Sequence, residues 1–158
     1  MRVEQIMARP AQYCRTEDTL ARAAQLMWDH DCGCLPVSGG DGATRVVGMI
    51  TDRDICMCAL FHNEPLQNLR VSHAMARQVQ ACKPGDSLAD AERTMRAARI
   101  RRLPVVDDDG TLVGMISPAD LAQEASREST ATTQEISETE VGDTLAAICR
   151  PLHRELVA

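Results

Sequence analysis

The chain has 158 residues, enough for one compact domain or for two small halves that share a core. A formal net charge of −6 and a single Trp, Tyr and Phe argue against a nucleic-acid surface, because such surfaces are basic and stack bases on aromatic rings. The sequence has no apolar run of membrane-spanning length and no signal-peptide pattern at its N-terminus, so we expect a cytoplasmic protein with no nucleic-acid or membrane partner.

An internal repeat covers most of the chain. Residues of the first half return 68 positions later, as Val3 and Val71, Met7 and Met75, Cys14 and Cys82, Leu20 and Leu88, and Met27 and Met95. Leu-Pro-Val at 35–37 returns at 103–105, and beyond it the offset falls to 66 because the first copy has the longer turn. A turn is where repeats tolerate a change of length, so two copies of one structural unit are predicted.

Each copy is predicted to fold as β-α-β-β-α, an α/β (α+β) arrangement. A short strand precedes an amphipathic helix that has Asp18 or Asp86 as its N-cap candidate, and two strands joined by a Gly-containing turn precede a second helix. The expected strands are 12–15, 35–37 and 45–50 in the first copy, and 79–82, 103–106 and 112–116 in the second. Neither copy alone has enough core, so we expect residues 1–68 and 69–125 to pack sheet against sheet as one pseudo-twofold module.

A Gly-Met-Ile-[Thr/Ser]-x-x-Asp stretch occurs once in each copy, where a strand runs directly into the second helix. Thr51 and Ser117 stand at the N-cap position, and Asp54 and Asp120 at the third helical position. The first N–H groups of a helix have no partner within the helix and carry the positive end of its dipole, so such a junction can also bind an anion. Helix capping alone explains the pattern, and the sequence leaves open whether a ligand is added to it.

The remaining residues, 126–158, form a third segment. Residues 126–140 are rich in Ser, Thr and Glu, which predicts a linker with little fixed structure. A capping box at 137–140 then begins a helix that should end or kink near Arg150, before Pro151. Its apolar stripe consists of Val141, Leu145, Ile148 and Leu152. We expect this stripe to dock on its own module, with a partner or a second subunit as the alternative.

The order of Val-x-x-x-Met, the capped helix, Leu-Pro-Val and the duplicated Gly-Met-Ile motif resembles the CBS domain, present as a tandem pair (a Bateman module) over residues 1–125. The resemblance implies a non-enzymatic regulatory module that binds an adenosine-containing ligand such as AMP, ADP or ATP as its effector and requires no cofactor. It also implies a homodimer formed through the helices that follow Thr51 and Ser117. Apolar surface for that contact would come from Ile55, Ala59 and Leu60.

The resemblance further implies which residues bind the ligand. In that family the Asp of the motif holds the ribose hydroxyls, and the Ser or Thr meets the phosphate. Matched to this chain, one site would use Asp54 with Thr51, and the other Asp120 with Ser117. The adenine pockets would be lined by Met49 and Met115, with Gln12 and Gln80 nearby.

The two copies differ just before Leu-Pro-Val. The second copy has Arg101 and Arg102, a place where family members that bind phosphorylated adenosine often carry a basic residue, whereas the first has Gly33 and Cys34. We therefore predict unequal sites, with the site of Ser117 and Asp120 tighter for a charged ligand. The alternative is that these Arg residues are solvated or paired with the acidic turn at 107–109.

Two competing functions remain open. Cys32 and Cys34 would lie on one face of a strand that begins early, which allows a thiol-responsive or metal-responsive protein; Cys56 and Cys58 point to nearly opposite faces of a helix. Alternatively, the protein is a ligand-free dimerising scaffold in which the two Asp residues only cap helices. The His residues show no catalytic pattern, so we expect neither a catalytic residue nor a metal site, and the protein target stays unknown.

Overall fold

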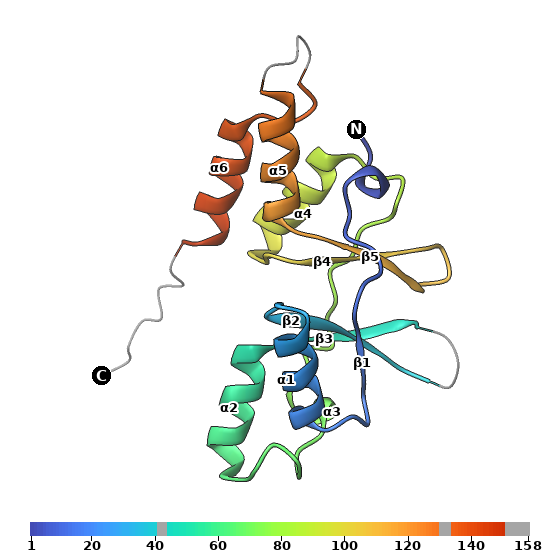
Figure 1. Ribbon diagram of the computed structural model, residues 1–158, viewed down its shortest axis with the longest axis vertical. Coiled ribbons are helices and arrows are strands. Elements are labelled where there is room, and N and C mark those ends of the chain that lie inside the picture. The colour runs from blue at the N-terminus through green and yellow to red at the C-terminus, as the bar shows by residue number, and fades with distance from the viewer. Residues whose placement is uncertain (41–43, 130–133, 151–158) are drawn as a thin grey trace.

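The structure is a computed structural model that describes residues 1–40, 44–129 and 134–150. The first repeat consists of β1 (Cys14–Arg15), α1 (Leu20–Asp29), β2 (Cys34–Ser38), β3 (Val46–Thr51) and α2 (Asp52–His62). The second repeat consists of α4 (Leu88–Ala98), β4 (Leu103–Val106), β5 (Leu112–Ile116) and α5 (Pro118–Glu128). Two short helices, η1 (Val3–Gln5) and α3 (Val71–Ala74), precede the repeats, and α6 (Glu138–Ile148) follows them. The strands of both repeats lie in the middle of the molecule, and the helices of each repeat lie on its outer side (Figure 1).

The predicted strands of both hairpins are confirmed. In the first repeat β2 pairs antiparallel with β3, and β1 pairs parallel with β2. In the second repeat β4 pairs antiparallel with β5. The buried pairs Leu35 with Ile50, and Leu103 with Ile116, occupy equivalent places in the two ladders. The alternation of apolar residues therefore predicted both the strands and the faces that they bury.

The predicted strand at 79–82 is wrong, because only Cys82 pairs, in a single parallel bridge to Val105. In the first repeat Thr16 extends the equivalent pairing, since its N–H donates to the carbonyl of Ser38 at 3.3 Å. The residue 68 positions later is Pro84, which has no N–H to donate. The ladder of the second repeat therefore stops after one residue.

The expected N-caps of the first helices are wrong by one position. Thr19 caps α1, where its hydroxyl accepts from the N–H of Arg22 at 3.1 Å, and Ser87 caps α4 in the same way. The carboxylates of Asp18 and Asp86 instead accept from backbone N–H groups three residues before them, at 2.8 Å each, and so close the preceding turn. Asp, Thr and Ser can all cap a helix. The path of the backbone decides which of two adjacent residues takes the N-cap position.

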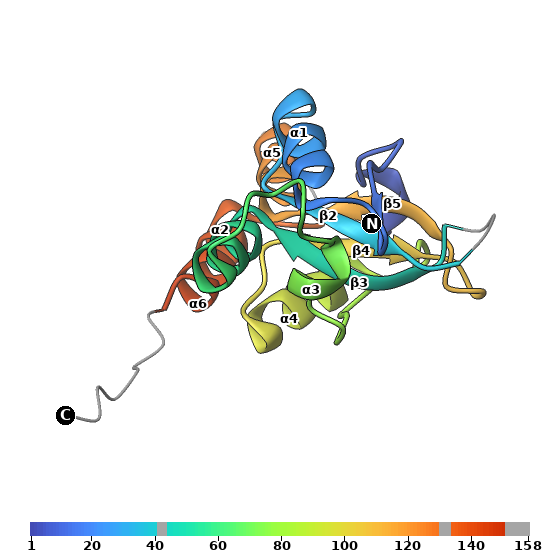
Figure 2. The same ribbon diagram turned by 90° about the horizontal axis from the view of Figure 1, so that it is seen from below.

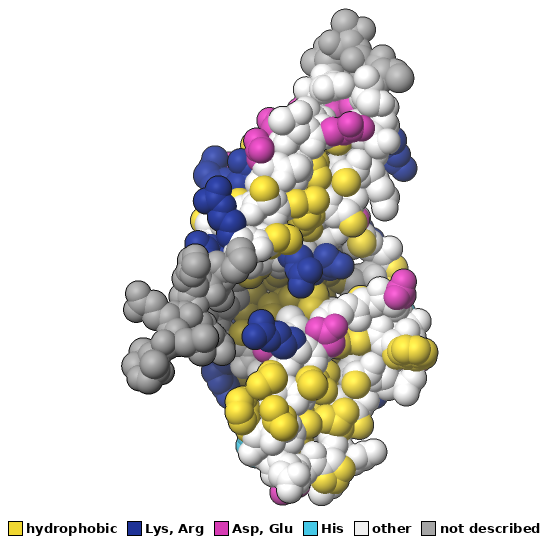
Figure 3. All heavy atoms as spheres, turned by 90° about the vertical axis from the view of Figure 1, so that its left-hand side faces the viewer, with side chains coloured by type: hydrophobic (Ala, Val, Ile, Leu, Met, Phe, Trp, Pro, Cys, Tyr) yellow, Lys and Arg dark blue, Asp and Glu magenta, His cyan; other side chains and the backbone are white. Residues whose placement is uncertain are grey.

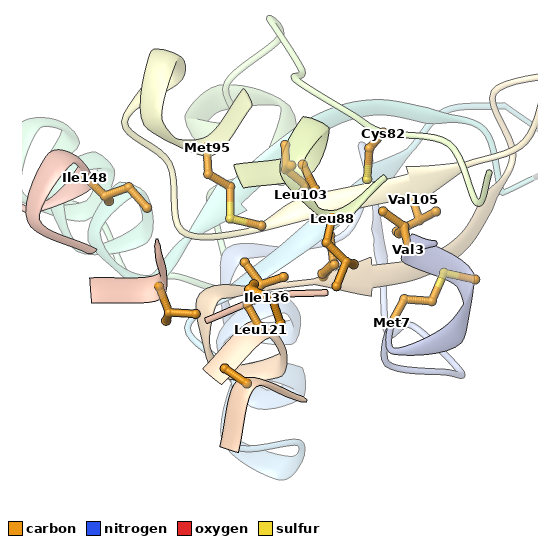
Figure 4. Close-up of a cluster of buried hydrophobic side chains, with 14 residues drawn as sticks. Val3, Met7, Cys82, Leu88, Met95, Leu103, Val105, Leu121, Ile136 and Ile148 are labelled. Atoms are coloured by element: carbon orange, nitrogen blue, oxygen red, sulfur yellow. The ribbon is translucent and has the colours of Figure 1, made fainter. Parts of the chain in front are cut away.

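Each repeat completes its core with the lead-in segment of the other. Val3 and Met7, which precede the first repeat, are buried in the core of the second, as Figure 4 shows. Val71 and Met75, which precede the second repeat, are buried in the core of the first. This exchange explains why neither copy alone has enough apolar residues to fold, and it ties the two sheets into one module.

The Gly of each duplicated motif allows these lead-in segments to approach. A Cβ built on Gly114 would lie 2.5 Å from the sulfur of Met7, and one on Gly48 would lie 2.9 Å from the sulfur of Met75 and 3.0 Å from the carbonyl oxygen of Ala76. A side chain at either position would meet atoms that are already packed. The Gly of the motif is therefore required by the packing between the repeats.

The tail is more ordered than the sequence suggested. Residues 126–128 belong to α5, and Ile136 is buried, so the expected unstructured linker at 126–140 is wrong for these residues. The predicted capping box is confirmed, because Ser137 caps α6 and bonds to Glu140. The helix was predicted to end near Arg150, and α6 ends two residues before it, at Ile148; Pro151 and Leu152 lie outside the described residues.

The helix α6 docks on α4 and α5 of its own chain, as expected, and both ribbon views place it on the same side of the module as α2 (Figures 1 and 2). Val141 and Ile148 are buried in the core of the second repeat. The predicted stripe is wrong at Leu145, which is 40% exposed, because Thr144 takes the inward position and is fully buried. Within the part of the chain that the structure describes, no helix is long and apolar enough to cross a bilayer.

Candidate functional site

The two strand-to-helix junctions have the expected capping geometry. The N–H and the hydroxyl of Thr51 both donate to Oδ2 of Asp54, at 2.9 and 2.7 Å. The N–H and the hydroxyl of Ser117 both donate to Oδ2 of Asp120, at 2.7 Å each. In each junction Oδ1 of the Asp takes no part in the cap, so one carboxylate oxygen is left to accept from another hydroxyl.

The junction at Ser117 lines a pocket with both its Ser and its Asp, whereas Thr51 and Asp54 are not among the residues that line that pocket. A cavity of about 230 Å³ lies between the repeats at the N-terminus of α5. It brings together five of the ten predicted binding residues, namely Gln12, Arg102, Met115, Ser117 and Asp120. Its volume lies just below the range of about 300–1,000 Å³ that is usual for small-molecule pockets. Five of the residues predicted to bind the ligand therefore line one cleft, and their role in binding stays a prediction.

Both repeats contribute to this cleft. The segment from Ala8 to Gln12 forms one wall and is held over β5 by Ala8, whose N–H donates to the carbonyl of Met115 at 2.8 Å. The start of β2, with Leu35 and Pro36, forms another wall. A ligand in the cleft would touch the first repeat on one side and the helix cap of the second on the other.

The other predicted residues do not line this cleft. Met49, Thr51 and Asp54 are half-buried at the first repeat's junction, where the N–H of Met49 donates to the carbonyl of Ala76 at 2.9 Å, and Gln80 is exposed. Arg101 is also exposed, and its carbonyl oxygen accepts from the guanidinium of Arg102 at 3.0 Å.

The acidic turn at 107–109 does not hold either Arg through the contacts that the structure describes. Asp108 pairs with Lys83, and the carbonyl oxygen of Asp109 accepts from Arg45 at 2.8 Å. The alternative in which that turn pairs with Arg101 or Arg102 therefore has no support in the described contacts. Arg102 lines the cleft and is itself exposed.

Among the lining residues that were not predicted to bind, three have ionisable side chains, namely His30, Cys32 and Cys34. The repeat offset of 68 makes Cys34 the counterpart of Arg102. In a pseudo-twofold module two equivalent residues lie close together when both are near the axis, so this offset could have identified Cys34. Cys32 precedes β2, and His30 is the C-cap of α1.

The thiols of the cleft are not activated. Burial outweighs the opposing field of Arg102 and raises the pKa of Cys34 to about 11. Burial also raises the pKa of Cys32 above its ordinary value. Both thiols are therefore protonated near neutral pH, and a protonated thiol is a poor nucleophile and a poor metal ligand. Across residues 1–40, 44–129 and 134–150, no three His, Cys, Asp or Glu side chains are placed so that they could hold a metal ion.

Comparison with known proteins adds to this geometry. CBS domain-containing protein YhcV of Bacillus subtilis is 38% identical over 104 residues, which are 66% of this chain and 71% of YhcV. Hypoxic response protein 1 of Mycobacterium tuberculosis is 32% identical over 106 residues, which are 67% of this chain and 72% of that protein.

Two solved structures are similar over most of their length. The crystal structure of Hypoxic Response Protein I, described as having two coordinated zinc ions, is 29% identical with a TM-score of 0.70, over 78% of this chain and 98% of that one. The CBS domain pair of protein MJ0100, in complex with 5′-methylthioadenosine and S-adenosyl-L-methionine, is 25% identical with a TM-score of 0.68, over 78% of this chain and 94% of that one.

The family assignment rests on both halves of the chain. The CBS domain profile matches residues 3–59 and again residues 71–127, and these two ranges cover nearly all of the first and the second repeat. Because well over half of the residues are matched and the fold is shared with solved domain pairs, the chain belongs to the CBS domain family and carries a tandem CBS pair.

Proposed function

We propose that the protein is a regulatory sensor of an adenosine-containing ligand, which binds in the cleft beside Ser117 and Asp120. The observation that carries this proposal is the convergence of Gln12, Arg102, Met115, Ser117 and Asp120 on one cavity from both repeats. Helix capping requires only Ser117 and Asp120, so it does not explain why an Arg, a Gln and an apolar wall face the same space.

The chemistry of the cleft suits the parts of such a ligand. The free Oδ1 of Asp120 can accept from a ribose hydroxyl, while Oδ2 stays in the cap. The guanidinium of Arg102 and the N-terminus of α5 both favour a phosphate. Apolar atoms of Met115, Pro10 and Pro36 can cover the faces of a purine.

Related structures support the ligand class. The CBS pair of MJ0100 was solved with two adenosine-containing molecules, 5′-methylthioadenosine and S-adenosyl-L-methionine. That pair shares the fold of this chain at 25% identity. We infer the same class, an adenosyl ligand, for this protein; AMP, ADP and ATP are our candidates because Arg102 adds a positive charge to the cleft.

A sensor of this kind needs no catalytic residue. The ligand would contact both repeats, so it would favour the arrangement of the module that fits it, and a protein target would respond to that arrangement. We therefore propose a non-enzymatic cytoplasmic regulator that acts through protein contacts, as a homodimer and without a required cofactor.

The two sites should differ in affinity. The cleft at Ser117 contains Arg102, whereas the residues at the first repeat's junction, Thr51 and Asp54, are not part of that cleft. We propose that the Ser117 site is the tighter one for a charged ligand. The Thr51 site then serves as an internal comparison.

Thermal unfolding of the purified protein tests the proposal. AMP, ADP, ATP, NAD and S-adenosylmethionine are added in turn to wild type, Asp120→Asn and the matched variant Asp54→Asn, because a ligand that prefers the folded state raises the midpoint. We expect one adenosyl ligand to raise the wild-type midpoint, Asp120→Asn to lose most of that rise and Asp54→Asn to keep it. No rise with any ligand would overturn the sensor, and a loss only in Asp54→Asn would move the site to the first repeat.

A metal-responsive role is the second candidate, because the related Hypoxic Response Protein I is described with two coordinated zinc ions; in this chain His30, Cys32 and Cys34 share a cleft but are not placed to hold a metal ion together. Zinc added in the same unfolding experiment tests it. A rise with zinc that is lost in Cys34→Ser would favour this role over nucleotide sensing.

A further inference from the structure

His30 belongs to the first repeat and lines the cleft between the repeats. It is the C-cap residue of α1, where its N–H donates to the carbonyl of Leu26 at 3.1 Å, and it is exposed. Ser117 and Asp120 line the same cleft from the second repeat, at the N-terminus of α5. A ligand bound at the cap of α5 would therefore have an imidazole among its neighbours.

The turn that follows α1 fixes where His30 lies. Asp31 has a φ of 48°, in the left-handed region, and its N–H donates to the carbonyl of Trp28 at 3.3 Å. The N–H of Cys32 donates to the carbonyl of Met27 at 2.9 Å. A left-handed residue with a hydrogen bond that reaches back across the last turn is a Schellman motif, which ends a helix in a defined geometry. The backbone at His30 is thus held beside the cleft.

The equivalent turn of the second repeat has no His. The offset of 68 aligns His30 with Ala98. The residues that follow, Asp31 and Arg99, are both left-handed, with φ of 48° and 52°, so the two turns have the same backbone. Ending the helix in this way does not require an imidazole, because the second repeat does it with Ala98. Another reason is needed for the His in the first repeat.

Arg102 is the basic residue that lines the cleft from the second repeat. In the first repeat the N–H of Asp52 donates to the carbonyl of Gly33 at 3.0 Å. The equivalent pair in the second repeat is Pro118 and Arg101, and Pro has no N–H to donate. The carbonyl of Arg101 instead accepts from the guanidinium of Arg102 at 3.0 Å. Pro118 thus leaves an acceptor that holds the guanidinium of Arg102.

The two differences between the repeats meet in one cleft. By the pseudo-twofold relation, the counterparts of His30 and Arg102 at the first repeat's junction are Ala98 and Cys34, and neither is basic. The cleft at Ser117 therefore receives a basic side chain from each repeat. Basic side chains also lie above and below the hollow in the middle of the molecule, between the two repeats (Figure 3). This distribution of charge favours an anion between the repeats.

Charged groups of both signs surround His30. Asp29 and Asp31 flank it in the chain, and the last carbonyl groups of α1 form the negative end of the helix dipole. Asp120 and Arg102 line the cleft with it, the first negative and the second positive. A phosphate in the cleft would add negative charge beside the imidazole, and nearby negative charge favours the protonated form. The ligand can therefore decide whether His30 carries a proton.

The other lining residues do not offer this response near neutral pH. Burial raises the pKa of Cys34 to about 11 and raises the pKa of Cys32 above its ordinary value. The lining residues of the segment 8–12 are Ala8, Pro10, Ala11 and Gln12, which have no titratable side chain. An imidazole, in contrast, ordinarily changes its charge between pH 5 and 8. His30 is therefore the lining group suited to respond to pH.

We propose that His30 and Arg102 together bind the phosphate of the adenosyl ligand, and that His30 takes up a proton when the ligand binds. This inference rests on the proposed function and adds a second cation and a pH response to the same site. A protonated imidazole attracts phosphate more strongly than a neutral one, so phosphorylated ligands bind more tightly as the pH falls toward 6. Adenosine has no phosphate and gains nothing from the proton.

Isothermal titration with AMP, ADP and ATP at pH 6 and pH 8 tests the proposal, with adenosine as the uncharged reference. His30→Gln should weaken nucleotide binding about tenfold at pH 6 and only slightly at pH 8, because the lost group is charged mainly at the lower pH. The matched control is His62→Gln, on α2 and outside the cleft lining, which should bind like wild type. Comparing variants at each pH cancels the protonation of the ligand itself.

His30→Lys separates the charge from the imidazole. Lys stays protonated at both pH values, so this variant should bind AMP more tightly than wild type at pH 8. Proton uptake gives a second readout, from titrations at pH 7 in buffers of different ionisation enthalpy. Wild type should take up as much as about one proton more per bound AMP than His30→Gln does.

The outcomes separate this inference from the proposed function. Equal pH dependence and equal proton uptake in wild type and His30→Gln would overturn the inference and leave the sensor intact. An equal loss of adenosine and AMP binding in His30→Gln would also overturn it, because His30 would then support the shape of the cleft. Binding of S-adenosylmethionine but of no phosphorylated ligand would do the same. Binding of no adenosyl ligand at either pH would overturn the proposed function and this inference with it.

Discussion

The two strand-to-helix junctions have nearly the same sequence, and in both the N–H and the hydroxyl of the cap residue donate to the Asp, yet Ser117 and Asp120 line the cleft between the repeats whereas Thr51 and Asp54 do not. The difference lies in what other segments bring to each of them. Arg102, Cys34 and the segment before β1 meet at Ser117, and Arg102 has no basic counterpart at the equivalent position of the first repeat. The comparison teaches that the motif specifies a helix cap, and that the surrounding segments decide whether the Ser or Thr and the Asp of the cap line the cleft between the repeats.

The largest loss of stability is expected from placing a side chain on the Gly of either motif, where the lead-in segment of the other repeat packs. Gly48→Val should lower the free energy of unfolding by about 3 kcal/mol or more, the upper end for overpacking. Gly114→Val should cost less, because its Cβ meets only the flexible side chain of Met7, whereas that of Gly48 also meets the backbone oxygen of Ala76. Urea unfolding of both variants measures the difference. An equal loss of free energy of unfolding in the two variants would show that the backbone at Ala76 moves aside as easily as the side chain of Met7.

A second comparison sets the covered outer side of the second repeat against the open one of the first. Thr144→Val keeps the shape of the side chain but removes the hydroxyl that bonds to Glu92, which is itself buried. Leaving a buried carboxylate without this donor should cost about 2 kcal/mol in urea unfolding. Thr139→Val, at an exposed position of the same helix, is the control and should cost much less. A Thr144 variant as stable as wild type would mean that α6 is held by its apolar residues alone.

The proposed difference in affinity between the two ligand sites is tested by removing Arg102, the positive charge that lines one cleft and has no counterpart in the first repeat. Arg102→Ala should weaken binding of a phosphorylated ligand about tenfold, the loss of one charge-assisted hydrogen bond, and leave adenosine nearly unchanged. Arg101→Ala is the matched control, because Arg101 is exposed and does not line the cleft. Isothermal titration with adenosine, AMP and ATP reports both. An equal loss for adenosine would place Arg102 in a structural role.

The smallest effect concerns the thiols. At pH 8 about one in a thousand Cys34 side chains should be ionised, because burial raises its pKa to about 11. Iodoacetamide followed by mass spectrometry should therefore label exposed Cys56 well before Cys34, and the labelling of Cys34 should accelerate as the pH rises toward 11. The control is the urea-unfolded chain, in which both should react at similar rates. Rapid labelling of Cys34 at pH 8 would revive the thiol-responsive hypothesis.

Particular residues show where the sequence was sufficient. Leu103 to Val106 and Leu112 to Ile116 were predicted with their observed bounds, because alternating apolar residues between Gly-containing turns leave little freedom. The strand predicted at 79–82 is wrong because only Cys82 pairs, and Pro84 prevents the ladder from extending beyond Cys82 as it extends to Thr16 in the first repeat. The prediction that Leu145 faces the core is wrong. Helical spacing favoured this apolar residue, but Thr144 faces inward because its hydroxyl bonds to Glu92 and Arg96 of α4.

The sequence by itself determined the repeat, the order of strands and helices, the caps at Thr51 and Ser117, and the family, because these depend on local periodicity and on residue types at fixed spacing. The tertiary structure decided which lead-in segment completes which core, which junction lines a described cleft, and where α6 docks. Those outcomes depend on contacts between residues far apart in the chain, such as Ala8 with Met115 or Glu92 with Thr144, and no spacing within one repeat encodes them.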